Sequence, residues 1–156
     1  MSMTIEQAFS RLEQALPADR LPGARTDFLY RLALAAHRHL GGKLRILPTA
    51  WPADATWLSV WYTPGVSSVS RASRDDADQS FELTGRGSRV AIVTDSTRVL
   101  GDGDCTPPGG MGVMEGKALR MKLLGGFDAV PLCLDTRDPG GRPVPSRIVE
   151  TVAAAT

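Results

Sequence analysis

Cysteine, histidine and aromatic residues are all scarce in this chain of 156 residues. Two cysteines, Cys105 and Cys133, are too few for a disulfide framework and lack the CxxC spacing of a redox or zinc site. Free thiols are typical of a reducing compartment, so we expect a cytoplasmic protein. The two histidines, His37 and His39, stand two positions apart, where side chains on a helix point to different faces. A metal pair is therefore not expected there.

Net charge and long apolar runs are also missing. The 18 basic and 17 acidic residues give a formal net charge of +1, and no basic cluster alternates with aromatic residues. Nucleic acid is thus not an expected partner. The longest apolar runs, such as residues 32–36 and 90–93, are far shorter than the ~20 residues of a membrane span. Residues 1–9 have no apolar core of a secretory signal, so no membrane contact is expected.

Residues 1–41 are predicted to form an N-terminal helical segment. Thr4 and Gln7 have the spacing of a capping box, and apolar residues recur behind them at helical intervals. A second helix is predicted to begin at Thr26. It should end at Gly41, because glycine is common just after the last turn of a helix.

Residues 42–156 alternate between strand and helix patterns. Strands are expected at residues 43–47, 89–94, 98–100 and 129–134, and helices at residues 66–77, 112–124 and from 146. This alternation favours an α/β fold, a three-layer domain with a largely parallel sheet. Together with the helical segment it would form one compact domain, which at this length needs no disulfide or metal for stability.

Two glycine-rich stretches approach nucleotide-binding motifs without completing them. The run from Gly101 to Asp104 opens like a dinucleotide fingerprint, but Thr106 replaces a required glycine and the acids would repel a pyrophosphate. The run from Gly112 to Ala118 is one residue short of a Walker loop and ends in alanine, where Ser or Thr would hold magnesium. We therefore expect these residues to bind no NAD(P) and no other cofactor.

Three acids, Asp95, Asp102 and Asp104, are expected on loops near strand ends, where ligands collect in open α/β sheets. A site for a hard cation is one interpretation. The other is that the acids cap helices and turns, which we favour because such acidic loops are common. No metal site is therefore predicted.

Lys117 and Tyr62 are the candidates for acid-base chemistry. Lys117 is expected within the first two turns of a helix, where the helix dipole and partial burial favour a neutral amine that can act as a base. Tyr62 precedes Thr-Pro-Gly and would be held on a rigid turn, where its phenol could donate a proton. A surface lysine and a packing tyrosine are the structural alternatives.

Several stretches resemble, in order and spacing, the N-terminal domain of malic enzymes. They are residues 62–66 (YTPGV), 90–95 (VAIVTD), 99–104 (VLGDGD), 113–119 (VMEGKAL) and 128–135 (DAVPLCLD). Malic enzymes combine hydride transfer to NAD(P), metal-assisted loss of CO₂ and proton transfers that convert an enol to a keto acid. The resemblance also implies an oligomer.

The resemblance implies roles for individual residues. Tyr62 matches the general acid of the family, Lys117 its general base, and Arg98 an arginine that faces a substrate carboxylate. We expect Arg98, Asp102 and Asp104 to contact the substrate. The sequence departs from the family at Asp102, where an apolar residue is usual, and at positions 105–106, where Ile or Leu precedes Gly.

No nucleotide-binding domain is recognisable in these 156 residues, so the expected function is a cofactor-independent enzyme that applies Lys117 and Tyr62 to a carbonyl or enol substrate. Such a lyase, isomerase or cyclase of a biosynthetic pathway could catalyse isomerisation, decarboxylation, dehydration or cyclisation. One alternative is the substrate-domain subunit of a split malic enzyme, which needs a separate Rossmann-type chain. Another is a binding domain for a small acid. A symmetric homodimer built on the N-terminal helices is expected, because their apolar surface exceeds what one small sheet can cover.

Overall fold

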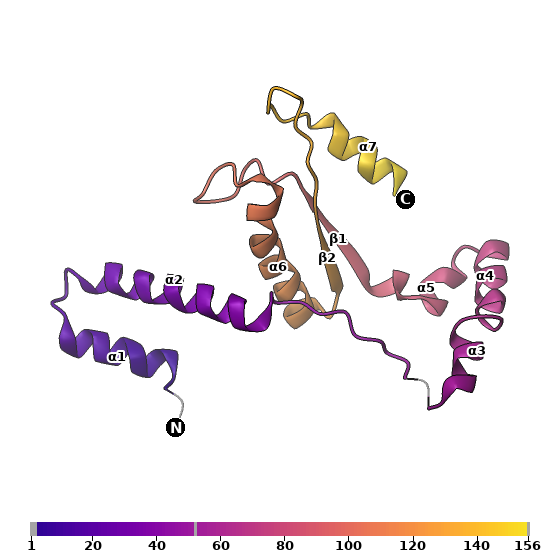
Figure 1. The fold of residues 1–156 in the computed structure, drawn as a ribbon, viewed down its shortest axis with the longest axis horizontal. Coiled ribbons are helices and arrows are strands. Elements are labelled where there is room, and N and C mark those ends of the chain that lie inside the picture. The colour runs from indigo at the N-terminus through magenta and orange to yellow at the C-terminus, as the bar shows by residue number, and fades with distance from the viewer. Residues whose placement is uncertain (1–2, 52, 156) are drawn as a thin grey trace. The chain divides into compact units, whose positions relative to one another are not determined.

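A computed structural model describes residues 3–51 and 53–155 of the chain (Figure 1). Its elements are, in order, α1 (Ile5–Ala15), α2 (Leu21–Leu40), the 3₁₀ helix η1 (Ala55–Trp57), α3 (Leu58–Trp61), α4 (Val66–Asp75), α5 (Gln79–Leu83), the 3₁₀ helix η2 (Gly85–Ser88), β1 (Arg89–Thr94), α6 (Thr106–Gly125), β2 (Asp128–Cys133) and α7 (Ser146–Ala154). Its contacts divide into two units, Met1–Lys43 and Leu44–Thr156. No helix among the described residues is long and apolar enough to cross a membrane.

The first unit is a hairpin of α1 and α2. Its predicted capping box is present, because the Thr4 hydroxyl accepts from the Gln7 N–H while the Gln7 side chain accepts from the Thr4 N–H. The rings of Phe9 and Phe28 meet edge to face at 6.0 Å between centroids and join the two helices. Only Ala8 is buried in α1, and no residue of α2 is buried.

The start of α2 was predicted five residues too late. Pro22 occupies the first turn of α2, where a missing N–H costs nothing, so the helix begins at Leu21. Thr26 lies inside the helix, and its hydroxyl donates to the Pro22 carbonyl at 3.0 Å. The predicted end is confirmed, since Gly41 adopts a left-handed conformation with φ 68°.

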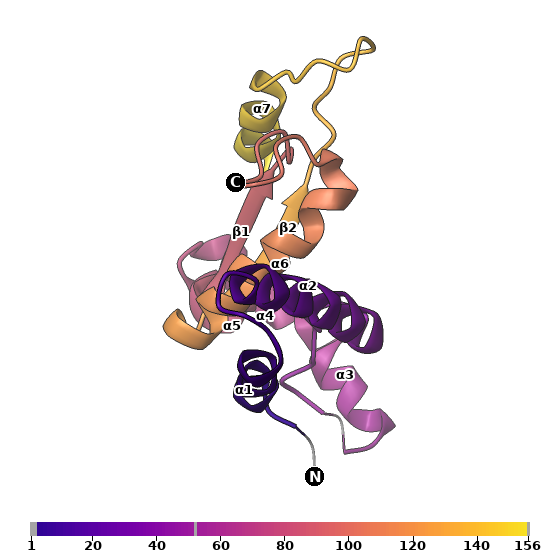
Figure 2. The same cartoon turned by 90° about the vertical axis from the view of Figure 1, so that its left-hand side faces the viewer.

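The second unit contains the sheet, and the predicted α/β class is confirmed. Strands β1 and β2 pair in parallel, with Val90 opposite Ala129 and Ile92 opposite Pro131. Helix α6 connects the strands and packs on them, as Figures 1 and 2 show. The buried residues of α6 are spaced four apart and so lie on one face of the helix. They are Gly110, Met114 and Ala118. The sheet of the described residues therefore has two strands.

Two predicted strands are wrong. Residues 43–47 have no regular structure, and residues 98–100 lie in a tight turn closed by a single bridge between Val99 and Gly103. Gly101 and Gly103 both have positive φ, so the chain folds back before a strand can extend. An alternating pattern of three to five residues is too short to secure a strand without a neighbour to pair with.

Helix α6 also begins earlier than predicted, at Thr106 rather than near residue 112. The prolines at 107 and 108 fit its first turn, and Asp104 Oδ1 caps it by accepting from the Thr106 N–H at 3.0 Å. The resemblance to malic enzymes placed a glycine at position 106. Thr106 has φ 58°, a left-handed conformation that glycine adopts freely and a β-branched residue does not.

We expect the substitution Thr106→Gly to raise the free energy of unfolding by about 1 kcal/mol, because it removes left-handed strain and keeps the backbone N–H that Asp104 accepts from. Thr106→Ala keeps a Cβ and should gain less. Urea unfolding midpoints of the three proteins measure the difference. A midpoint for the glycine variant below that of the parent would contradict the assignment of strain.

Candidate functional site

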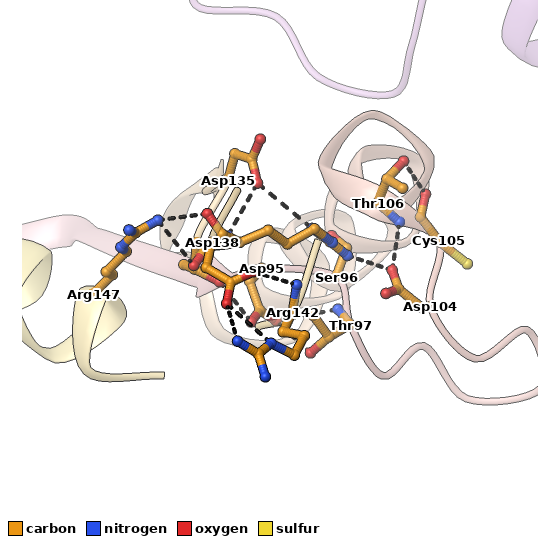
Figure 3. A network of polar contacts seen from close by, with 12 residues as sticks. Asp95, Ser96, Thr97, Asp104, Cys105, Thr106, Asp135, Asp138, Arg142 and Arg147 are labelled. Atoms are coloured by element: carbon orange, nitrogen blue, oxygen red, sulfur yellow. Dashed lines mark hydrogen bonds and ion pairs between the residues drawn. The ribbon is translucent and has the colours of Figure 1, made fainter. Parts of the chain in front are cut away.

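The carboxyl ends of β1 and β2 lie at the same edge of the sheet, the edge at which open α/β sheets bind ligands. Thr94 and Cys133 are paired there, and the Leu134 N–H donates to the Thr94 carbonyl at 2.8 Å. Residues 95–98 leave β1 at this edge, and residues 135–137 leave β2. Figure 3 shows the polar contacts that hold these segments together.

Asp95 joins the two strand ends. Its Oδ1 accepts from the Thr97 N–H at 3.1 Å and from the Thr97 hydroxyl at 2.7 Å, and its Oδ2 accepts from the Thr136 hydroxyl at 3.0 Å. Burial raises the pKa of Asp95, but the hydrogen bonds from Thr97 and Thr136 outweigh burial and leave that pKa below its ordinary value. Asp95 is therefore a charged group whose two oxygens are both engaged.

Asp104 also has structural partners. Besides capping α6, its carboxylate forms an ion pair with Arg137, a largely buried side chain from the segment after β2. The Arg147 guanidinium, from the start of α7, donates to the Arg137 carbonyl at 2.6 Å. The interpretation of the acids as caps thus describes Asp104 well, and its predicted contact with substrate has to compete with these bonds.

Arg98 and Asp102 lie on the surface just beyond this network. Both side chains are exposed, and neither has a hydrogen bond or ion pair with any residue that the structure describes. Between them, Val99 is buried and anchors the turn, with its N–H donating to the Gly103 carbonyl at 2.7 Å. Arg98 is therefore free to meet an anion from solution. Among the residues described, no group of three His, Cys, Asp or Glu could hold a metal ion.

Lys117 is exposed on α6, eleven residues beyond Thr106. At 1.5 Å per residue it lies about 16 Å from the start of the helix, whereas the helix dipole acts within the first turn. The expected activation of Lys117 by a nearby helix N-terminus is thus wrong, because α6 starts before residue 112. Its amine has no partner among the described residues.

Tyr62 follows α3 and is 72% exposed. The turn predicted around it is present, since the Val66 N–H donates to the Tyr62 carbonyl at 2.7 Å and the Gly65 N–H to the Ser59 carbonyl at 2.8 Å. Helix α3 contacts η1 and α4, and Figure 1 shows it on the far side of α5 from α6. One copy of the described chain therefore does not bring Tyr62 to Lys117.

Three residues of this network, Thr136, Arg137 and Ser96, were not predicted from the sequence. Thr136 and Arg137 directly follow β2, and their position after a predicted strand was the only available signal. Ser96 is 1% exposed with φ 59°, and its hydroxyl has no hydrogen-bond partner. It packs on Gly110 of α6, and a glycine inside a predicted helix is the signal that marks such a close approach.

A shallow apolar groove lies at the opposite edge of the sheet, between the start of β1 and the end of α6. Its lining residues are Val90, Arg120, Met121, Leu124, Gly125 and Phe127. None of the predicted site residues is among them. The groove is therefore separate from the candidate site at the carboxyl edge.

A small parallel sheet with a helical crossover defines an α/β domain. A family model described as the N-terminal domain of malic enzyme matches residues 41–140. The chain belongs to the malic enzyme family.

Relatives of known sequence and structure agree with this assignment. The chain is 45% identical over 103 residues to an NAD-dependent malic enzyme of Geobacillus stearothermophilus, a match that covers 64% of this chain and 21% of the relative. It is 38% identical over 120 residues to a bifunctional malic/malolactic enzyme of Bacillus subtilis, covering 77% and 28%. The crystal structure of Entamoeba histolytica malic enzyme superposes with a TM-score of 0.85 at 45% identity, covering 97% of this chain and 32% of that one. The chain thus spans a fifth to a third of these proteins.

These comparisons correct the expected function. A cofactor-independent lyase, isomerase or cyclase of a biosynthetic pathway is wrong, because the relatives that share its motifs are NAD- and NADP-dependent malic enzymes. That expectation rested on the lack of a nucleotide-binding domain within 156 residues. Because the matches cover only part of each relative, the end of this sequence says nothing about the chemistry of the whole enzyme.

The start of α6 does not fit the pyrophosphate of a nicotinamide cofactor. A pyrophosphate binds at a helix N-terminus through free N–H groups. At the start of α6 the Asp104 carboxylate already takes the Thr106 N–H, and the two prolines at 107 and 108 have no N–H to donate. No step that involves NAD(P) is therefore assigned to the start of α6.

Proposed function

We propose that this chain forms the substrate side of an NAD(P)-dependent malic enzyme, and that the nucleotide-binding part lies outside residues 1–156. Arg98 carries the proposal, because it is an exposed arginine without a partner, held by a braced turn at the carboxyl edge of the sheet. The shared motifs and the likeness to the Entamoeba histolytica enzyme support it.

The proposed roles follow the chemistry of three side chains. Arg98 binds a carboxylate of malate through charge-assisted hydrogen bonds. Lys117 accepts the proton of the substrate hydroxyl, and Tyr62 returns a proton to the enol carbon as the keto acid forms. Each of these three side chains is exposed and makes no hydrogen bond or ion pair with another described residue. Its polar group is therefore available to a substrate.

Tyr62 and Lys117 must approach within reach of one small substrate, about 10 Å, for these roles to hold. One chain does not achieve this, so we propose that the site is completed between two copies. The aromatic surface around Tyr62 supports this, because Trp57 and Trp61 stack at 6.0 Å between centroids while both stay exposed. Stacked exposed tryptophans are typical of surfaces that partners cover.

The test of the proposed function is a titration of the chain with L-malate, followed by NMR. We expect saturable shifts of the backbone N–H signals of residues 99–103, lost in Arg98→Gln and kept in Arg120→Gln, a control that removes another exposed arginine from the opposite edge. Adding the nucleotide-binding part should then give malate-dependent reduction of NAD(P). Binding that survives Arg98→Gln, or no binding by the parent chain, would refute the proposal.

We further propose that the chain forms a homodimer through the helices of its first unit. Leu29, Leu32 and Leu40 recur at helical spacing on α2 and are all exposed, and a hairpin of about 40 residues buries too little to be stable alone. A second copy that covers this face supplies the missing burial. A cytoplasmic location stays a prediction from the sequence.

Leu29→Asp is expected to shift the chain from dimer to monomer, because a carboxylate in the covered face would lose its hydration. Arg31→Asp, on the opposite side of the same helix, is the matched control and should stay dimeric. Light scattering at micromolar concentration measures the mass of each. A monomeric parent chain would overturn the proposed dimer.

A further inference from the structure

Asp95 is a buried carboxylate that the proposed chemistry leaves without a role, although it lies three residues from Arg98. It is 8% exposed. Thr97 gives two hydrogen bonds to one of its oxygens, and Thr136, 41 residues away in sequence, gives one to the other. Burying a carboxylate costs free energy unless hydrogen bonds compensate for the lost water. Three donors from two segments do so here, which indicates that Asp95 does more than solvate a turn.

These bonds determine the course of the backbone after β1. They close residues 95–97 into a turn in which Ser96 has φ 59°, and the Ser96 N–H donates to the Thr94 hydroxyl at 3.0 Å. A left-handed conformation costs a serine about 1 kcal/mol or more, so the surrounding bonds must hold it. Arg98 is the next residue after this turn, so the conformation of the turn determines where the backbone of Arg98 lies.

Arg98 has no anchor of its own. Its side chain makes no polar contact within the described residues, so its place depends on the backbone on either side of it. On one side is the turn closed by Asp95, and on the other is the buried Val99. Loss of the Asp95 bonds would leave Arg98 held from one side only.

The partner strand end is itself fixed. Thr136 is 1% exposed, and its carbonyl accepts from the Val144 N–H at 3.2 Å and from the Arg147 guanidinium at 3.3 Å. Arg147 lies at the start of α7, and Figure 3 shows it on the same network as Asp95. Thr136 is therefore held in place, and its hydroxyl is a fixed hydrogen-bond donor to Asp95.

We propose that Asp95 is a positioning residue for Arg98: by joining the ends of β1 and β2, its carboxylate sets the turn that directs Arg98 to the substrate carboxylate. This inference rests on the proposed function, in which Arg98 binds malate. It also makes a statement about the free protein, namely that Arg98 is ordered before any ligand arrives.

The chemistry of the contacts predicts which substitutions can replace Asp95. Asparagine keeps an oxygen for both Thr97 bonds, and its amide can donate to the Thr136 hydroxyl, which is able to accept. Alanine removes all three bonds and leaves buried hydroxyls without partners. Asp95→Asn should therefore rescue the function that Asp95→Ala loses.

The experiment compares L-malate affinity in the full chain of the parent, Asp95→Ala and Asp95→Asn, together with the NMR relaxation of the Arg98 backbone and side-chain N–H groups without ligand. We expect Asp95→Ala to weaken malate binding about tenfold to a hundredfold. The relaxation of the Arg98 N–H groups should then show increased mobility. The malate affinity of Asp95→Asn should stay within about threefold of the parent, and its Arg98 N–H groups should stay ordered. This is expected because the proposed role needs the hydrogen bonds of Asp95 and not its charge. If Asp95→Ala does not fold, Thr136→Val removes only one of the bonds and should shift both readouts in the same direction.

Met114→Ala is the control for loss of stability alone, because Met114 is buried in α6 and takes no part in the hydrogen bonds of Asp95. It should lower the melting temperature while leaving malate affinity and the Arg98 signals of the folded protein unchanged. Parent-like affinity and order in Asp95→Ala would overturn the inference, as would failure of Asp95→Asn to rescue. If the parent binds no malate, the proposed function fails. The inference about Asp95 is then tested by the relaxation of the Arg98 N–H groups alone, and unchanged relaxation in Asp95→Ala overturns it.

Discussion

Lys117→Ala is expected to lower the turnover of the assembled enzyme by about 10² to 10⁴, the usual contribution of a general base. The loss should appear in kcat, because the amine acts on the reacting proton. Tyr62→Phe removes the proposed acid and should cost about the same. Because both act in one proton-transfer sequence, the double variant should lose far less than the product of the two single losses.

Neither substitution should unfold the chain. Lys117 is exposed on a helix whose seating depends on Met114 and Ala118, and alanine is the best helix former. Lys122→Ala is the matched control, since Lys122 lies on the same helix and pairs with Asp128 at 2.7 Å, away from the proposed chemistry. Steady-state rates of malate-dependent NAD(P) reduction by the parent and the four variants measure these effects. Full activity of Lys117→Ala would show that another group is the base.

Gly110→Ala is expected to destabilise the chain by about 3 kcal/mol or more, because overpacking in a closed site displaces its surroundings. A Cβ at this position would lie 1.9 Å from the Ser96 hydroxyl oxygen and 2.5 Å from the Ser96 Cβ. Ser96 is buried under α6 and held by the turn after β1, so it cannot move aside. The helix must then lift from β1.

The rescue variant makes this prediction specific. Ser96→Gly removes both clashing atoms and relieves a left-handed serine, so Gly110→Ala combined with Ser96→Gly should recover most of the lost stability. Gly116→Ala is the control, because its Cβ would meet nothing within 4 Å, and it should stabilise α6 by up to about 1 kcal/mol. Urea unfolding gives the free energies. Additive effects of the substitutions at 96 and 110 would mean that the two residues are not in contact.

Local signals in the sequence predicted local structure well. The capping box at Thr4, the helix end at Gly41 and the strand at 89–94 each depend on a few neighbouring residues, and each is present. The starts of α2 and α6 were predicted too late, because both helices have proline in the first turn, where it fits but lies outside the apolar repeat that predicted each helix.

The candidate site was predictable only in part. The motifs singled out Arg98 and Lys117, but partial burial was expected for Lys117, whereas the structure leaves it exposed on α6. The bond between Asp95 and Thr136 joins residues 41 positions apart and depends on the parallel pairing of two strands. No periodicity in one strand reveals its partner, so this contact, and the burial of Ser96 under Gly110, required the structure.

Pro131 in β2 decides on which side the sheet can grow. The Leu134 N–H donates to Thr94, so alternate residues of β2 face β1 and those between them, including Pro131, face outward. Proline has no N–H, so the outer edge of β2 lacks a donor at its centre and cannot complete a ladder with a further strand. The outer edge of β1 carries the N–H groups of Ala91 and Val93 at the corresponding place. Any strand that extends this sheet, from the rest of the enzyme or from another copy, therefore adds beside β1.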